Sequence, residues 1–286
     1  MVTIVAGAAR LLIEFAESTF NLSIHPLARI FIAVFPVVIA SFIVTEKLTK
    51  RNKEGEKNHM KISPLFFITG IGMVGVAVAS ALWIISLGAD WSVLLLGALA
   101  WIISVALKIA WAVLTHKPIL NFLKTKLPTK LSGPISWSYI GLLTGIFECG
   151  IALVFVLKLP ILYQANWVYT LAFGVGFGAI EALVLGLLSL VRIGYYTIRP
   201  KSIPEKEREG LKITPDSLRT IPLGIVERVS ALLIHIFTKA AIILAVQQSI
   251  YLLFWFSFGF KSLVDGIAGW MHLEKDIRSV TKASQM

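Results

Sequence analysis

This chain consists largely of long apolar stretches separated by short polar segments. They cover about 26–45, 64–87, 92–115, 135–157, 167–193, 221–247 and 250–272. A helix of about 20 apolar residues is long enough to cross the hydrocarbon core of a bilayer. The sequence therefore predicts an all-α fold, a polytopic membrane bundle of about seven transmembrane helices.

The composition agrees with a membrane protein. Of the 286 residues, 57% are hydrophobic and only 15% are charged, whereas about a quarter of an ordinary globular domain is charged. We expect a single integral membrane domain over residues 1–286. Cys149 is the one cysteine, so the chain forms no internal disulfide.

The polar segments divide this domain into parts. The first residues combine Arg10, Glu14 and Glu17 with apolar residues at helical spacing, which is typical of an interfacial amphipathic helix. We predict the following parts: an interfacial helix at 1–24, three spans within 25–134, four spans within 135–272 and a cytoplasmic tail at 273–286.

The net charge of +11 is distributed unevenly between the connecting segments. Six Lys or Arg residues follow the first stretch, four follow the third, six follow the fifth and three lie in the tail, while the alternate connections hold only Lys158. The positive-inside rule then places the N-terminus outside and the C-terminus in the cytoplasm. Lipid head groups explain the basic segments better than nucleic acid, for which the sequence has no recognition motif.

Ionisable residues interrupt the last four predicted spans. A charged side chain at mid-bilayer costs about 2.5–3.5 kcal/mol on insertion scales, so such groups face other helices or a wet cavity. Two interpretations remain open: a catalytic or transport site, or buried ion pairs that lock helix packing. The residues are Glu148, Glu181, Glu227, Arg228, His235, Lys239, Lys261 and Asp265.

These residue types permit a limited chemistry. A carboxylate in an apolar pocket suits a general base that activates water, and a second carboxylate with a histidine can orient that water or bind a metal. The candidate catalytic residues are Glu148, Glu181, His235, Glu227 and Arg228. The candidate metal ligands are Glu148, Glu181 and His235, with zinc or a similar divalent ion as the cofactor. Lys261 and Asp265, one turn apart, are expected to form a structural pair.

Four short motifs in this part of the chain occur in a recognisable order. They are FECGIAL with Glu148, GFGAIE with Gly176, Gly178 and Glu181, the pair Glu227-Arg228 followed by His235, and KSLVD with Lys261 and Asp265.

Their order and spacing over about residues 140–270 resemble the YhfC family of predicted intramembrane endopeptidases, which is grouped with the CPBP and PrsW proteins. The resemblance implies a membrane-embedded peptidase fold. The chain departs from the family pattern in both kinds of residue. Cys149 stands in place of a second glutamate with no arginine after it, and Phe177 and Lys261 stand in place of histidines.

Three functions follow as hypotheses. The first is an intramembrane endopeptidase-like protein that hydrolyses a membrane-embedded peptide bond with its carboxylate and histidine residues. The second is a catalytically inactive relative that binds or scaffolds a membrane protein or lipid. The third is a proton-coupled transporter, for which buried ionisable residues are also usual. No internal repeat of the kind that many transporters show is visible in the sequence.

Overall fold

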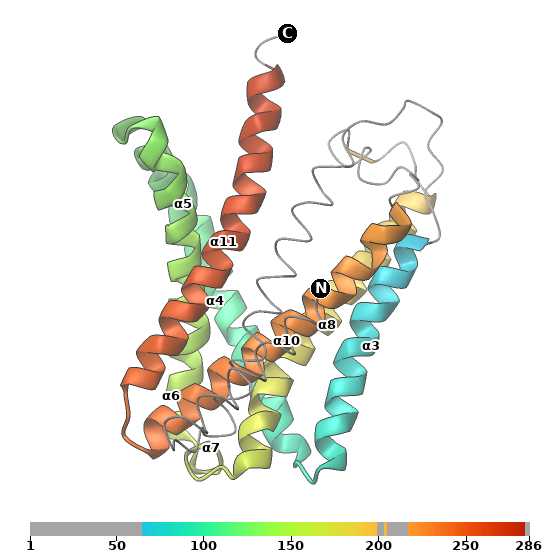
Figure 1. The fold of residues 1–286 in the computed structure, drawn as a ribbon, viewed down its shortest axis with the longest axis vertical. Helices are drawn as coiled ribbons and strands as arrows, with labels where there is room; N and C mark the ends of the chain where they lie inside the picture. Colours follow the sequence, from blue (N-terminus) through green and yellow to red (C-terminus); the bar gives the residue numbers. More distant parts are fainter. Residues whose placement is uncertain (1–64, 199–202, 205–216, 284–286) are drawn as a thin grey trace, which may run out of the picture. The chain divides into compact units, whose positions relative to one another are not determined.

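The structure is a computed structural model, and it describes residues 65–198, 203–204 and 217–283. Every regular element within these ranges is a helix (Figure 1). The helices are α3 (Leu65–Ser86), α4 (Trp91–Lys126), α5 (Thr129–Thr144), the π-helix η1 (Gly145–Cys149), α6 (Gly150–Lys158), α7 (Pro160–Tyr163), α8 (Trp167–Ile198), α10 (Ser217–Gln247) and α11 (Leu252–Ala283).

Six helical segments in the described part of the chain are long and apolar enough to cross a membrane. They coincide with the second to seventh predicted stretches: Phe67–Ser86, Trp91–Leu123, Leu131–Lys158, Trp167–Ile198, Pro222–Gln247 and Leu252–Trp270. The prediction of a multi-pass helical membrane protein is therefore confirmed. The predicted span 26–45 and the interfacial helix at 1–24 lie outside the described residues.

The segment after the third span differs from the prediction. The sequence predicts a basic, proline-broken loop from about residue 116, but α4 continues through Pro118 to Lys126. Proline is tolerated in membrane helices because neighbouring groups and local adjustment satisfy the carbonyl that it leaves without a donor. The next helix, α5, begins at Thr129 directly after Pro128, so the connection is much shorter than expected.

Asp90 fixes the start of α4. Its side chain accepts a hydrogen bond from the Ser92 backbone N–H at 2.7 Å and caps the helix. This bond from the Ser92 amide lowers the pKa of Asp90. The cap thus defines where the long helix that carries Lys108 begins.

The described helices group into two compact units. The first unit contains α3 together with residues 178–198 of α8 and 217–237 of α10. The second unit contains α4, α5, η1, α6, α7 and α11 together with residues 167–177 of α8 and 238–247 of α10. The single-domain organisation that the sequence suggests stays a prediction.

Glycines allow close helix packing in the first unit. A Cβ added at Gly70 would lie 2.7 Å from Leu190 Cγ, and one added at Gly72 would collide with Ile225. Small residues let membrane helices approach closely, because no strong hydrophobic force drives them together within lipid. Of the three glycines in α3, Gly75 has open space beside it. The glycines therefore hold α3 against α8 and α10 at specific points.

The second unit uses the same device between α5 and α11, which run side by side (Figure 1). A Cβ added at Gly141 would collide with the Ser262 carbonyl and lie 2.8 Å from the Gly266 nitrogen. A Cβ added at Gly145, one turn on, would collide with the Ser262 hydroxyl. These contacts bring η1, which carries Glu148, against the part of α11 that carries Lys261.

We expect Gly141→Ala to destabilise the protein by about 1–3 kcal/mol, because overpacking forces backbone shifts. The matched control is Gly150→Ala, where the added methyl meets nothing within 4 Å, and its effect should be near neutral. The midpoint of SDS-induced unfolding in mixed micelles measures both variants. Equal midpoints for the two variants would contradict the close approach of α5 and α11.

Candidate functional site

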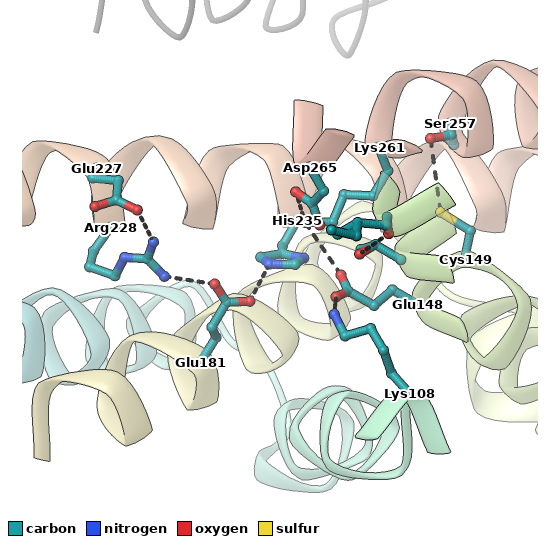
Figure 2. Close-up of polar contacts among 12 residues, drawn as sticks. Lys108, Glu148, Cys149, Glu181, Glu227, Arg228, His235, Ser257, Lys261 and Asp265 are labelled. Carbon is teal, nitrogen blue, oxygen red and sulfur yellow. Dashed lines mark hydrogen bonds and ion pairs between the residues drawn. The ribbon is translucent and has the colours of Figure 1, made fainter. Parts of the chain in front are cut away.

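The contacts between ionisable side chains form two groups, each within one compact unit. Figure 2 shows residues of both groups. The Glu181 cluster belongs to the first unit and consists of Glu181, Glu227, Arg228 and His235. The Glu148 cluster belongs to the second unit and consists of Lys108, Glu148, Lys239, Lys261 and Asp265.

In the Glu181 cluster, each oxygen of the Glu181 carboxylate meets a nitrogen from α10. Arg228 Nη1 donates to Glu181 Oε1 at 2.7 Å, and His235 Nε2 lies 2.9 Å from Glu181 Oε2. The histidine is fully buried, whereas the Glu181 side chain is 17% exposed. The carboxylate is therefore held from two sides and remains the reachable member of the pair.

Helix geometry explains why these groups meet. Arg228 and His235 are seven residues apart on α10, so they lie on nearly the same side of the helix. A Cβ added at Gly178 of α8 would lie 3.0 Å from Leu232 Cα and 3.3 Å from His235 Cβ. The bare glycine thus lets α8 approach α10 one turn before Glu181, which brings the carboxylate within reach of both nitrogens.

Glu227 has a different position from the rest of the cluster. It pairs with Arg228 Nη2, but its side chain is 64% exposed. Arg228 therefore bridges two carboxylates, whereas the sequence suggested only the neighbouring pair. The contact between Arg228 and Glu181 joins residues 47 positions apart, and no local pattern in the sequence indicates it.

In the Glu148 cluster, the central carboxylate lies on the π-helix η1. π-helical turns inside α-helices are rare and occur frequently at functional sites. The Glu148 side chain is 3% exposed. Lys239 of α10 donates to the Glu148 backbone carbonyl at 3.0 Å, so a buried ammonium group satisfies a backbone acceptor within the irregular turn.

Two further lysines bind the Glu148 carboxylate itself. Lys108 Nζ of α4 lies 2.8 Å from Glu148 Oε1, and Lys261 Nζ of α11 lies 3.3 Å from Oε2. Lys261 also lies 3.2 Å from Asp265 Oδ1. Lys108 is not among the predicted site residues. It is the lone charged residue within the apolar stretch 92–115, and that isolation was the available signal.

Two neighbours complete this cluster. The Lys239 ammonium, which is fully buried, lies 3.9 Å from the centre of the Phe177 ring, a favourable cation–π geometry. Cys149 is also fully buried, with its Sγ 3.9 Å from the Ser257 carbonyl of α11. This environment is that of a small packing residue rather than of an exposed nucleophile.

The fold and these clusters define a class: a multi-pass helical membrane protein with ionisable groups buried within its spans. A comparison with protein families then identifies the chain more closely, because the family described as YhfC intramembrane metalloprotease matches residues 72–281. The chain belongs to this family. The resemblance seen over about 140–270 is confirmed and extends into α3 and α4. No curated protein and no solved structure matches the chain.

Membership of this family supports a membrane protease-like function, and the family description implies a metal ion. The described residues do not fit one. Among them, no group of three or more His, Cys, Asp or Glu side chains is placed to hold a metal. Both oxygens of Glu148 face lysine ammonium groups, which would repel a cation, and one oxygen of Glu181 is bound by Arg228. The predicted ligand set of Glu148, Glu181 and His235 stays a prediction.

Proposed function

We propose that this protein is an intramembrane endopeptidase-like protein that uses the Glu181 cluster, without a metal, to hydrolyse a membrane-embedded peptide bond. The observation that carries the proposal is the double contact of Glu181. His235 Nε2 lies 2.9 Å from one oxygen, and Arg228 holds the other at 2.7 Å. A general base fixed in this way needs no rearrangement before it accepts a proton.

Each residue then has a role in the reaction. Glu181, which is partly exposed, accepts a proton from water, and the water oxygen forms a bond to the carbonyl carbon of the peptide. Arg228 orients the carboxylate through its first oxygen, and the His235 N–H holds the second oxygen. The C–N bond then breaks, and the proton held by Glu181 passes to the leaving amine nitrogen. Glu227 acts only through Arg228.

The position of the Glu181 cluster within the spans indicates the kind of substrate that can reach it and the surroundings of the site. Glu181 lies in the span Trp167–Ile198, and His235 lies in the span Pro222–Gln247. A peptide bond that reaches them belongs to a membrane-embedded protein or peptide, and the surrounding partner is the lipid bilayer. Nucleic acid is not a partner in this proposal.

The proposed orientation places the N-terminus outside and the C-terminus in the cytoplasm of the cell that carries the protein in its membrane. It is supported by the basic segments, which alternate with segments that hold only Lys158. Fusion of a reporter that is active only in the cytoplasm to the C-terminus should give signal. A signal from the same reporter in the 158–166 connection would contradict the proposal.

Hydrolysis can be tested directly. The purified protein in lipid vesicles is incubated with a library of single-span peptides in water enriched in oxygen-18. We expect products whose new carboxylate carries oxygen-18, and we expect a chelator to leave their yield unchanged. Unlabelled products, or products lost on chelation, would overturn the metal-free mechanism.

A second candidate function, a non-hydrolytic relative, is favoured by the Glu148 cluster. Lysine nitrogens lie 2.8 and 3.3 Å from the two oxygens of its central carboxylate. Such ion pairs can hold helices together without a catalytic role. This candidate predicts no product from any peptide, together with retention of a membrane partner during purification of both wild type and Glu181→Gln. The family match lends no support to the transporter hypothesis.

A further inference from the structure

The Glu148 cluster collects three lysines within predicted membrane spans, and each comes from a different helix. Lys108 lies on α4, Lys239 on α10 and Lys261 on α11. Burying an ammonium group is expensive unless it is paired and hydrogen-bonded. The arrangement of these lysines around one residue therefore requires a structural explanation.

All three ammonium groups converge on Glu148. Two bind its carboxylate oxygens, at 2.8 and 3.3 Å, and the third binds its backbone carbonyl at 3.0 Å. Asp265 adds a second carboxylate through Lys261. The buried carboxylate of Glu148 is thus already surrounded by cations that belong to the chain.

Lys261 and Phe177 both take part in this arrangement. Lys261 provides one of the ammonium groups. Phe177 provides the ring face on which the Lys239 ammonium rests, at 3.9 Å. Neither side chain offers a lone pair to a metal, and each places or supports a lysine.

We propose that the ammonium groups of Lys108, Lys239 and Lys261 take the place of a metal ion at Glu148, so that this unit folds and persists without one. A divalent ion such as zinc binds carboxylate oxygens at about 2.0–2.2 Å and needs lone pairs from several ligands. Lysine ammonium groups offer no lone pair and compete for the same oxygens. The proposal is independent of whether Glu181 hydrolyses a substrate.

The first test uses the full-length protein in detergent micelles. Metal content is measured by mass spectrometry, and the melting temperature is measured with and without a chelator and across a zinc titration. We expect far less than a stoichiometric amount of metal and no shift of the melting temperature with either reagent. A stoichiometric metal, or a melting temperature that a chelator lowers, would overturn the proposal.

Two substitutions at Lys261 test whether its ammonium group takes the place of a metal. Lys261→Arg keeps the positive charge beside Glu148 and Asp265 and should melt without zinc dependence, as wild type does. Lys261→His exchanges the ammonium group for an imidazole between two carboxylates, and zinc should raise its melting temperature. If Lys261→His fails to fold, Lys261→Arg and wild type still decide the question, because zinc stabilisation of either would contradict the proposal.

Discussion

Replacing Glu148 by glutamine should lower the free energy of unfolding by about 3–5 kcal/mol, the cost of leaving one partner of a buried ion pair without the other. The Glu148 side chain is 3% exposed, and its carboxylate balances Lys108 and Lys261. The amide of glutamine keeps the shape but removes the negative charge. The midpoint of SDS-induced unfolding in mixed micelles measures the loss.

A matched control separates burial from charge. Glu227→Gln removes a carboxylate whose side chain is 64% exposed, so its effect should stay within about 1 kcal/mol. Adding Lys261→Met to Glu148→Gln removes a cation together with the anion and should recover part of the lost stability. Additive losses in the double variant would show that Glu148 and Lys261 are not coupled.

Glu181→Gln should reduce peptide cleavage by about a hundredfold to ten-thousandfold, the usual contribution of a positioned general base. The glutamine oxygen can still accept a hydrogen bond from Arg228 or His235, but its NH₂ group cannot accept one and cannot take a proton from water. The initial rate of product formation, measured in lipid vesicles with a cleaved single-span peptide, tests this expectation.

The comparison with Glu227→Gln decides whether the effect is specific to Glu181. Both carboxylates pair with Arg228, and Glu181 also lies 2.9 Å from His235 Nε2. We expect Glu227→Gln to lose less than about tenfold in rate, since its charge acts only through the guanidinium. Comparable losses in the two variants, or no loss in Glu181→Gln at an unchanged melting temperature, would remove Glu181 as the base.

Hydropathy alone was sufficient to locate the spans. A helix of about 20 apolar residues has a length fixed by the bilayer, so the described spans fall where the apolar stretches predicted them. The prediction that this helix ends near residue 115 was wrong. Pro118 suggests a helix end, but α4 continues through it, because a membrane helix accommodates proline. The π-turn at Glu148 was not predicted, since no residue pattern in GIFEC specifies it.

Most of the polar residues of both clusters could be predicted from the sequence, because charged groups are conspicuous within apolar spans. It could not assign their partners. The contact of Lys108 with Glu148 joins residues 40 positions apart, and that of Arg228 with Glu181 joins residues 47 apart. Such pairs depend on the rotation and the axial register of each helix against its neighbour. Close packing at glycines such as Gly178 determines both. The spans, the family pattern and most of the ionisable residues could thus be predicted from the order of residues along the chain. The pairing of Glu181 with His235, and the lysines around Glu148, depend on how the helices pack.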